Sequence, residues 1–173
     1  MKTLIAVIGG GEPPKEALVQ AEEVGRRIAE AGAAVVCGGL GGVMEAVCHG
    51  AHQAGGLTIA ILPTGHWSDA NPDVDIALPT GLGVARNVLV VMSGHAVIAI
   101  DGSYGTLTEI AHSMELSKPV FALSSWNLES AKLDPTLYVR VNSPEEAVRL
   151  ALRAARRPPK SQDPFRNHRG RED

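Results

Sequence analysis

A glycine-rich turn that ends in a carboxylate is the strongest chemical signal in this sequence. Residues 101–109 read Asp-Gly-Ser-Tyr-Gly-Thr-Leu-Thr-Glu, and they lead from an apolar run into a helical pattern. A carboxylate such as Glu109, placed early in that helix, can face a ligand held at the glycine turn and stabilise a developing cation on it. The same spacing also fits a capping box, in which Thr106 and Glu109 only satisfy free N–H groups of the first helical turn. Both interpretations remain open from the sequence.

A cation precedes this turn. Arg86 and Asn87 follow a Gly-Leu-Gly segment at the start of another predicted helix. A guanidinium group can bind a phosphate through two parallel hydrogen bonds, or it can pair with Glu109. The alternative is a solvated arginine, which the helix dipole disfavours in a first turn.

Glycines gather where predicted strands end. Eleven of the 19 glycines lie in four segments, residues 9–11, 38–42, 81–83 and 102–105. Glycine leaves no Cβ between backbone N–H groups and an anion, and helix N-termini add a positive partial charge. One such turn would be weak evidence, but several at one sheet edge favour a phosphate site. The residues we expect to bind the ligand are Gly10, Gly39, Gly41, Arg86, Asn87, Gly102, Ser103, Tyr104, Gly105 and Thr106.

The sequence does not match the motifs of two common classes of phosphate-binding protein. A dinucleotide fingerprint needs G-x-G-x-x-G after the first strand and an acidic residue after the second. Here Gly9-Gly10-Gly11 is followed by Glu-Pro-Pro, and the second strand ends in Cys37-Gly38. The sequence also lacks G-x-x-x-x-G-K-[ST]. A standard NAD(P) dehydrogenase and a P-loop NTPase are therefore not expected.

The elements that must position these residues alternate between strands and helices. Continuous Val, Ile and Ala runs predict strands that are covered on both faces, at 3–8, 33–37, 57–62, 96–100, 120–123 and 137–141, with a short one at 75–78. Helical periodicity predicts helices at 15–31, 43–54, 84–92 and 106–116, and a last one opened by Ser143 as N-cap. This order predicts an α/β fold, a Rossmann-like doubly wound parallel sheet flanked by helices in a single domain.

Composition limits the size, partners and location of the protein. With 173 residues, 45% hydrophobic but only 3% aromatic, one core of Val, Ile, Leu and Ala is expected, without base-stacking platforms of the RRM or OB kind. The net charge of −3 gives no nucleic-acid or membrane footprint, and two cysteines without a disulfide framework suit the cytoplasm. We expect a phosphate-binding domain at 1–155. The polar segment 156–173, with six basic and three acidic residues, is expected to be a flexible tail or a contact for an anion or a subunit.

No metal site is expected. Cys48 and His52 have i, i+4 spacing on one predicted helix, but zinc needs about four ligands and no matching second pair occurs. A solvated helix face with a half-buried Cys48 is the favoured interpretation. His95 and His112 are interpreted as structural histidines.

Several of these segments together resemble the LOG-like superfamily, whose members are often labelled lysine decarboxylases. The matching segments are residues 36–44, 55–63, 81–87, 96–109 and 118–120, within a stretch from about Thr3 to Leu123. The resemblance implies a Rossmann-like fold and a homodimer or homotetramer. Its phosphoribohydrolase members cleave nucleoside 5′-monophosphates into free base and ribose 5-phosphate. They use P-G-G-x-G-T-x-x-E, whose Glu matches Glu109, and an Arg-Lys pair, whose Arg matches Arg86.

The sequence departs from the hydrolase pattern at three positions. Asp101 stands in place of Pro, Ser103 in place of the second Gly, and Asn87 in place of Lys. These forms look more like the branch that includes the molybdenum cofactor carrier proteins, which bind a phosphorylated pterin. The resemblance thus implies a carrier of a molybdenum cofactor or a nucleotide, with no cofactor required for catalysis. The alternative is a phosphoribohydrolase in which Glu109 and Arg86 are catalytic.

Overall fold

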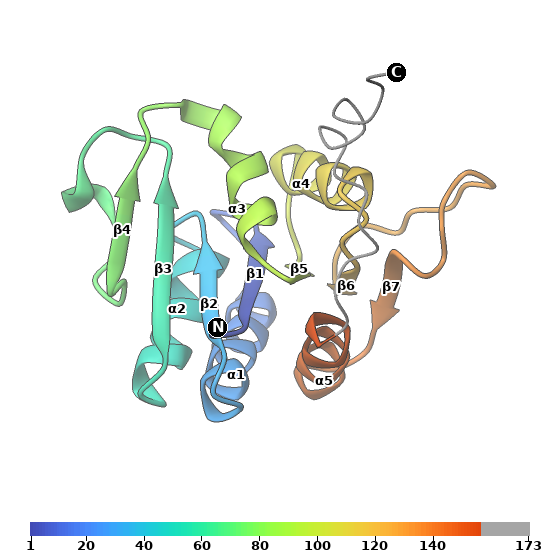
Figure 1. The fold of residues 1–173 in the computed structure, drawn as a ribbon, viewed down its shortest axis with the longest axis horizontal. Coiled ribbons are helices and arrows are strands. Elements are labelled where there is room, and N and C mark those ends of the chain that lie inside the picture. Colours follow the sequence, from blue (N-terminus) through green and yellow to red (C-terminus); the bar gives the residue numbers. More distant parts are fainter. Residues whose placement is uncertain (157–173) are drawn as a thin grey trace, which may run out of the picture.

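The computed structural model describes residues 1–156, which form a single α/β domain around a seven-stranded, all-parallel sheet. The strands lie in the order β4-β3-β2-β1-β5-β6-β7, and Figure 1 shows helices on both faces of the sheet. The strands are β1 (Leu4–Gly9), β2 (Ala34–Cys37), β3 (Leu57–Leu62), β4 (Ile76–Pro79), β5 (Ala96–Ile100), β6 (Val120–Leu123) and β7 (Tyr138–Val141). The helices are α1 (Lys15–Glu30), α2 (Val43–Gln53), α3 (Asn87–Ser93), α4 (Tyr104–Glu115) and α5 (Pro144–Ala155), with short 3-10 helices η1 (Trp67–Asp69) and η2 (Gly83–Arg86).

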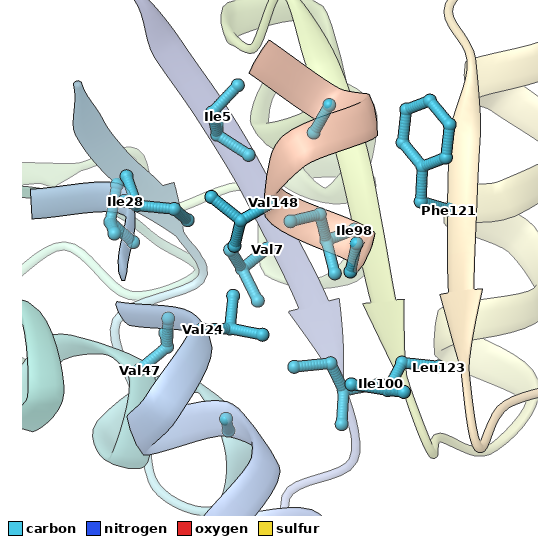
Figure 2. Close-up of a cluster of buried hydrophobic side chains, with 14 of the residues drawn as sticks. Ile5, Val7, Val24, Ile28, Val47, Ile98, Ile100, Phe121, Leu123 and Val148 are labelled. Atoms are coloured by element: carbon cyan, nitrogen blue, oxygen red, sulfur yellow. The ribbon is translucent and has the colours of Figure 1, made fainter. Parts of the chain in front are cut away.

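The apolar runs of the central strands supply the core on both faces. On one face, Val24 of α1 and Val148 of α5 pack against Val7 and Ile98 of the sheet, as Figure 2 shows. On the other face, side chains of α3 and α4 such as Val91 and Ile110 join a second cluster. The central strands are therefore buried on both sides, as their continuous hydrophobicity predicts.

Sheet topology places a crevice between β1 and β5. The chain runs outward from β1 through β2, β3 and β4, then returns to place β5 on the other side of β1. In open α/β sheets, ligands bind outside the carboxyl ends of the strands at this reversal of strand order. The glycine turns after β1 and β5 lie at the two sides of that point. The fold class expected from the sequence is confirmed.

Two predicted helices differ from the observed ones. The helix expected at 84–92 is divided into η2 and α3, with Gly83 at φ +55° at its start. Since this backbone conformation is left-handed, the chain enters a tight 3-10 turn before the α-helix begins. The helix expected at 106–116 begins earlier, at Tyr104. The other predicted elements lie within two residues of the observed ends.

The last described helix is α5, which ends just before Arg156, the last described residue. Ser143 caps α5 as expected, because its Oγ accepts a hydrogen bond from the Glu146 amide at 3.1 Å. The expected tail at 156–173 lies, beyond Arg156, outside the described residues. Within residues 1–156, no helix combines the length and the apolar character needed to cross a membrane.

Candidate functional site

A small polar cleft lies at the carboxyl ends of β1, β2 and β5. Its volume is about 130 Å³, and residues from both sides of the reversal of strand order line it. The lining residues are Val7, Ile8, Gly9, Gly10, Gly11, Gly38, Met44, Arg86, Asn87, Ser103, Gly105, Thr106 and Glu109. The topology has thus brought together segments that are about a hundred residues apart in the sequence.

Arg86 is the buried cation of this cleft, with 6% of its surface exposed. One terminal nitrogen, Nη2, donates to the carbonyl oxygen of Gly38 at 3.2 Å, and Nη1 donates to Oδ1 of Asn87. The third nitrogen, Nε, has no hydrogen-bond partner among the described residues. Burial lowers the pKa of Arg86, but guanidinium groups remain charged in proteins. A buried, charged donor that lacks a partner is costly, and Arg86 lines the cleft, where an anion would compensate its charge.

Glu109 faces the same guanidinium. The residue is also only 6% exposed, and its Oε1 lies 3.9 Å from Nη1 of Arg86. Burial raises the pKa of Glu109 to about 7, and the attraction of Arg86 offsets only part of this effect. The carboxyl group therefore exchanges a proton near neutral pH, which allows it to donate a hydrogen bond when protonated and to stabilise positive charge when ionised.

The start of α4 leaves backbone donors free at the cleft. Ser103 is the N-cap residue, and within residues 1–156 no side chain caps the first turn. The first N–H groups of a helix have no partner within the helix, and Ser103, Gly105 and Thr106 line the cleft. Glu109 lies in the second turn, so the capping-box interpretation of Thr106 and Glu109 is wrong. The interpretation fails because the helix begins at Tyr104, two residues before Thr106, so neither residue occupies the position that a capping box requires.

Seven of the residues singled out in the sequence meet in this cleft: Gly10, Arg86, Asn87, Ser103, Gly105, Thr106 and Glu109. Gly39, Gly41, Gly102 and Tyr104 do not line it. Gly39 instead has φ +76°, and a Cβ there would lie 2.5 Å from the Cβ of Ala60, so it allows the loop to pack on β3. Gly102 has φ +107°, and a Cβ would lie 2.3 Å from Oγ1 of Thr106, so it shapes the turn.

The lining residues also include Gly38 and Met44, which were not among the residues expected to bind the ligand, although Gly38 belongs to the glycine segment 38–42. A Cβ at Gly38 would lie 2.3 Å from Nη2 of Arg86 and 2.7 Å from Sδ of Met44. Gly38 thus makes room for the guanidinium of Arg86. Glycine is usual where another group must approach the backbone closely. The available signal was its place directly after the apolar run of β2, at the carboxyl edge of the sheet.

The cysteine and histidine cluster has other contacts. Cys48 is fully buried rather than half-buried, because it lies on the face of α2 that packs on β2, with its Sγ 3.5 Å from Sγ of Cys37. His49 pairs with Asp73 at 3.0 Å. His95 accepts a hydrogen bond from the amide of Leu4 at 3.1 Å, as a structural histidine does. Residues 1–156 contain no group of three His, Cys, Asp or Glu side chains arranged to hold a metal ion.

Comparison with known proteins matches the chain to one family along most of its length. The profile of the SLOG cluster4 family matches residues 2–148. An uncharacterised protein of Archaeoglobus fulgidus is 41% identical over 152 residues, which cover 86% of this chain and 93% of that protein.

Solved structures support the same relationship. The molybdenum cofactor binding protein of Rippkaea orientalis is 37% identical, with a TM-score of 0.82 over 88% of this chain and 97% of that one. The molybdenum cofactor carrier protein of Chlamydomonas reinhardtii is 31% identical, with a TM-score of 0.81 over 89% of this chain and 98% of that one. The resemblance to the LOG-like superfamily is therefore confirmed, and the chain belongs to its SLOG cluster4 family.

Proposed function

We propose that this protein binds a phosphorylated small molecule by its phosphate group at the cleft and acts as a carrier of that ligand. The observation that carries the proposal is the buried Arg86 guanidinium in the wall of the cleft, whose Nε has no hydrogen-bond partner among residues 1–156. This charge lies at the carboxyl edge of the sheet, beside the uncapped first turn of α4. Arginine, free helical N–H groups and glycine backbone are together the donors that bind phosphate.

Among phosphorylated small molecules, the ligand that we propose first is a molybdopterin-type cofactor. The second is a nucleotide. The proteins of Rippkaea orientalis and Chlamydomonas reinhardtii are described as binding or carrying the molybdenum cofactor, and both are similar to this chain over nearly their whole length. The cleft has polar donors for a phosphate group, and its volume of about 130 Å³ is well below the roughly 300 Å³ of small ligand pockets. It fits the phosphate end, and the remainder of the ligand would lie outside it.

A phosphoribohydrolase is the second candidate, favoured by Glu109. Cleavage of an N-glycosidic bond passes through an oxocarbenium-like ribosyl cation, which a nearby carboxylate stabilises. Glu109 is buried, lies 3.9 Å from Arg86 and exchanges a proton near neutral pH, so it also suits the transfer of a proton to or from water. Arg86, Gly105 and Thr106 would hold the 5′-phosphate in that reaction.

Calorimetric titration with ribose 5-phosphate and a panel of nucleoside 5′-monophosphates tests the phosphate site. Arg86→Gln is expected to weaken binding at least tenfold, because the buried positive charge is lost. Arg149→Gln, on the exposed side of α5, is the matched control and should bind as the wild type does. Absence of binding to every phosphorylated compound, including a molybdopterin extract, would overturn the proposal.

Product analysis separates the two candidates. A carrier leaves each nucleotide intact after prolonged incubation, whereas a hydrolase releases free base and ribose 5-phosphate. If base is released by the wild type and not by Glu109→Gln, the protein is an enzyme and the pure-carrier proposal is wrong.

We also propose that the protein is a cytoplasmic homodimer or homotetramer. Exposed apolar side chains gather around the edge strand β4 and the adjoining 3-10 helices, where they suit contact with a second copy: Trp67, Ile76, Leu78, Leu82 and Val84. Cys37 and Cys48 are free thiols although their sulfur atoms are 3.5 Å apart, which suits a reducing compartment.

A further inference from the structure

The cleft holds only the phosphate end of the proposed ligand, so another surface must contact the rest. The first turn of α4 forms one wall of the cleft through Ser103, Gly105 and Thr106. Tyr104 stands between these residues but does not line the cleft, and 78% of its surface is exposed. A ligand that extends from the cleft past this turn would therefore meet an exposed aromatic ring.

Tyr104 is not a lone surface residue, because Trp126 supports it. The centroids of the two rings are 5.8 Å apart, and their planes are tilted by 42°. Trp126 donates from Nε1 to the carbonyl oxygen of Ser103 at 3.2 Å, so the indole is fixed to the N-cap residue of α4. On the other side, the hydroxyl of the buried Tyr138 donates to the carbonyl oxygen of Trp126. These hydrogen bonds fix Trp126 beside the start of α4, and the Trp126 ring contacts the ring of Tyr104.

The exposure of Tyr104 indicates a role in ligand recognition rather than in the core. The described residues include few aromatic side chains, and a tyrosine that is 78% exposed contributes little to the core. Large exposed aromatic rings that are held rigid beside a polar site are typical of ligand recognition, since a π-face binds another planar ring with little loss of conformational entropy. Tyr104 fits this description, whereas the exposed Trp67 belongs to the apolar surface around β4.

We propose that Tyr104, supported by Trp126, is a stacking platform for the planar heterocycle of a ligand whose phosphate is bound at Arg86. The inference rests on the proposed phosphate site and narrows its ligand to phosphate esters that carry a heteroaromatic ring. Phosphorylated sugars without a ring of this kind would bind through the phosphate alone. The platform thus assigns specificity to Tyr104 and affinity for the anion to Arg86.

A comparison of GMP with ribose 5-phosphate tests the platform, because the two share the phosphate and the sugar and differ in the base. Guanine also contains the 2-amino-4-oxopyrimidine ring that pterins have. The wild type is expected to bind GMP roughly tenfold more tightly than ribose 5-phosphate, by calorimetry. Tyr104→Ala should remove this preference while leaving the affinity for ribose 5-phosphate unchanged, and Tyr104→Phe should keep it. If chromatography finds that GMP is cleaved, its carbocyclic analogue replaces it.

Tryptophan fluorescence gives an independent readout. Binding of GMP should change the emission of the wild type and of Trp67→Phe, and Trp126→Phe should lose that change. Equal binding of GMP and ribose 5-phosphate by both wild type and Tyr104→Ala would overturn the platform and leave the phosphate site standing. Failure of both compounds to bind the wild type would overturn the platform together with the phosphate site.

Discussion

Arg86 and Glu109 are oppositely charged side chains, yet they do not form a close ion pair. The distance of 3.9 Å leaves the guanidinium engaged with Gly38 and Asn87 instead. Asn87 stands where the hydrolase pattern has Lys, and its Oδ1 accepts a hydrogen bond from Arg86, which an ammonium group does not do. The substitution therefore replaces a second cation with a group that orients the first.

Asp101 changes the turn in a comparable way. It stands where the hydrolase pattern has Pro, and its φ is +51°. Proline fixes φ near −65°, so the turn of this chain has a backbone that the hydrolase motif does not allow at this position. The departure from the motif is thus a difference of shape at the ligand edge as well as of sequence.

The first prediction concerns the proton on Glu109. Burial raises its pKa from 4.5 to about 7, so the folded protein retains a proton that the unfolded chain loses between these pH values. This contribution to stability is complete below the unfolded pKa and is lost as the pH rises through the folded pKa. Relative to Glu109→Gln, the free energy of unfolding of the wild type should fall by on the order of 3 kcal/mol from about pH 4.5 to about pH 8. Urea unfolding at both pH values measures it.

Glu115→Gln is the control, because Glu115 is exposed at the end of the same helix. Its stability should follow that of the wild type across the same pH range. A parallel pH dependence of Glu109→Gln and the wild type would contradict the raised pKa.

Gly38→Ala tests the space that the guanidinium occupies. A Cβ at this position would lie 2.3 Å from Nη2 of Arg86, so the side chain must move and its hydrogen bond to Gly38 is lost. We expect phosphate affinity to fall roughly tenfold or more while the protein still folds, because the clash is with the ends of flexible side chains. Calorimetry with ribose 5-phosphate measures the change, and Gly65→Ala, which meets nothing within 4 Å, should bind as before. Unchanged affinity in Gly38→Ala would mean that Arg86 does not bind the anion from its present position.

Helices α1 and α2 show how closely two elements can approach when both carry glycine. A Cβ at Gly25 of α1 would lie 2.0 Å from the carbonyl oxygen of Val47, and one at Gly50 of α2 would lie 1.9 Å from that of Glu22. The two helices therefore contact each other backbone to backbone. This approach fixes α2 against the sheet, and Met44 in its first turn lines the cleft.

Gly50→Ala is expected to destabilise the protein by about 3 kcal/mol, because the helices must separate. Helix propensity alone predicts the opposite sign, a gain of about 1 kcal/mol for Gly to Ala inside a helix. His52→Ala, at an exposed position of the same helix, should change stability by less than about 0.5 kcal/mol. Denaturant unfolding distinguishes the two signs, and a stabilised Gly50→Ala would show that the close crossing does not constrain the fold.

The molecule as a whole presents two different sheet edges. At β7, the apolar side chains Tyr138 and Val141 are buried. At β4, the strand has Ile76 and Leu78 exposed at 43% and 47%. An exposed strand at a sheet edge with apolar side chains is prone to contact another chain, so this edge is where a second copy is expected.

Leu78→Asp is expected to convert the proposed oligomer into a smaller species, because the contact would have to bury a charge. Native mass spectrometry of the wild type and the variant at the same concentration measures this change. Val19→Asp changes an exposed position of α1, a helix that packs against β2 and β5. This variant should leave the oligomer intact. A wild type that is monomeric throughout would contradict the proposal itself.

Much of this architecture could be predicted from the sequence because its signals are local. Apolar runs and helical periodicity located the strands, and a hydroxyl before Pro144 located the start of α5. The turn at 101–109 was also recognised from a local signal, a glycine-rich stretch that ends in a carboxylate. Local signals did less well at Tyr104, because Gly105 in the first turn disfavours a helix, and Ser103 is the N-cap residue without making a side-chain cap.

By itself, the sequence determined the fold class, the edge of the sheet at which the cleft lies and the pair of charged residues that line it, since each follows from residue type and from spacing along the chain. Only the tertiary structure decided which glycines line the cleft and which pack against the rest of the protein. Gly38 and Gly39 are neighbours, but one makes room for Arg86 and the other for Ala60. That difference depends on which side chains other strands and turns bring to each position. The burial that shifts the proton equilibrium of Glu109 has the same origin, because it comes from the packing of segments that are far apart in the chain.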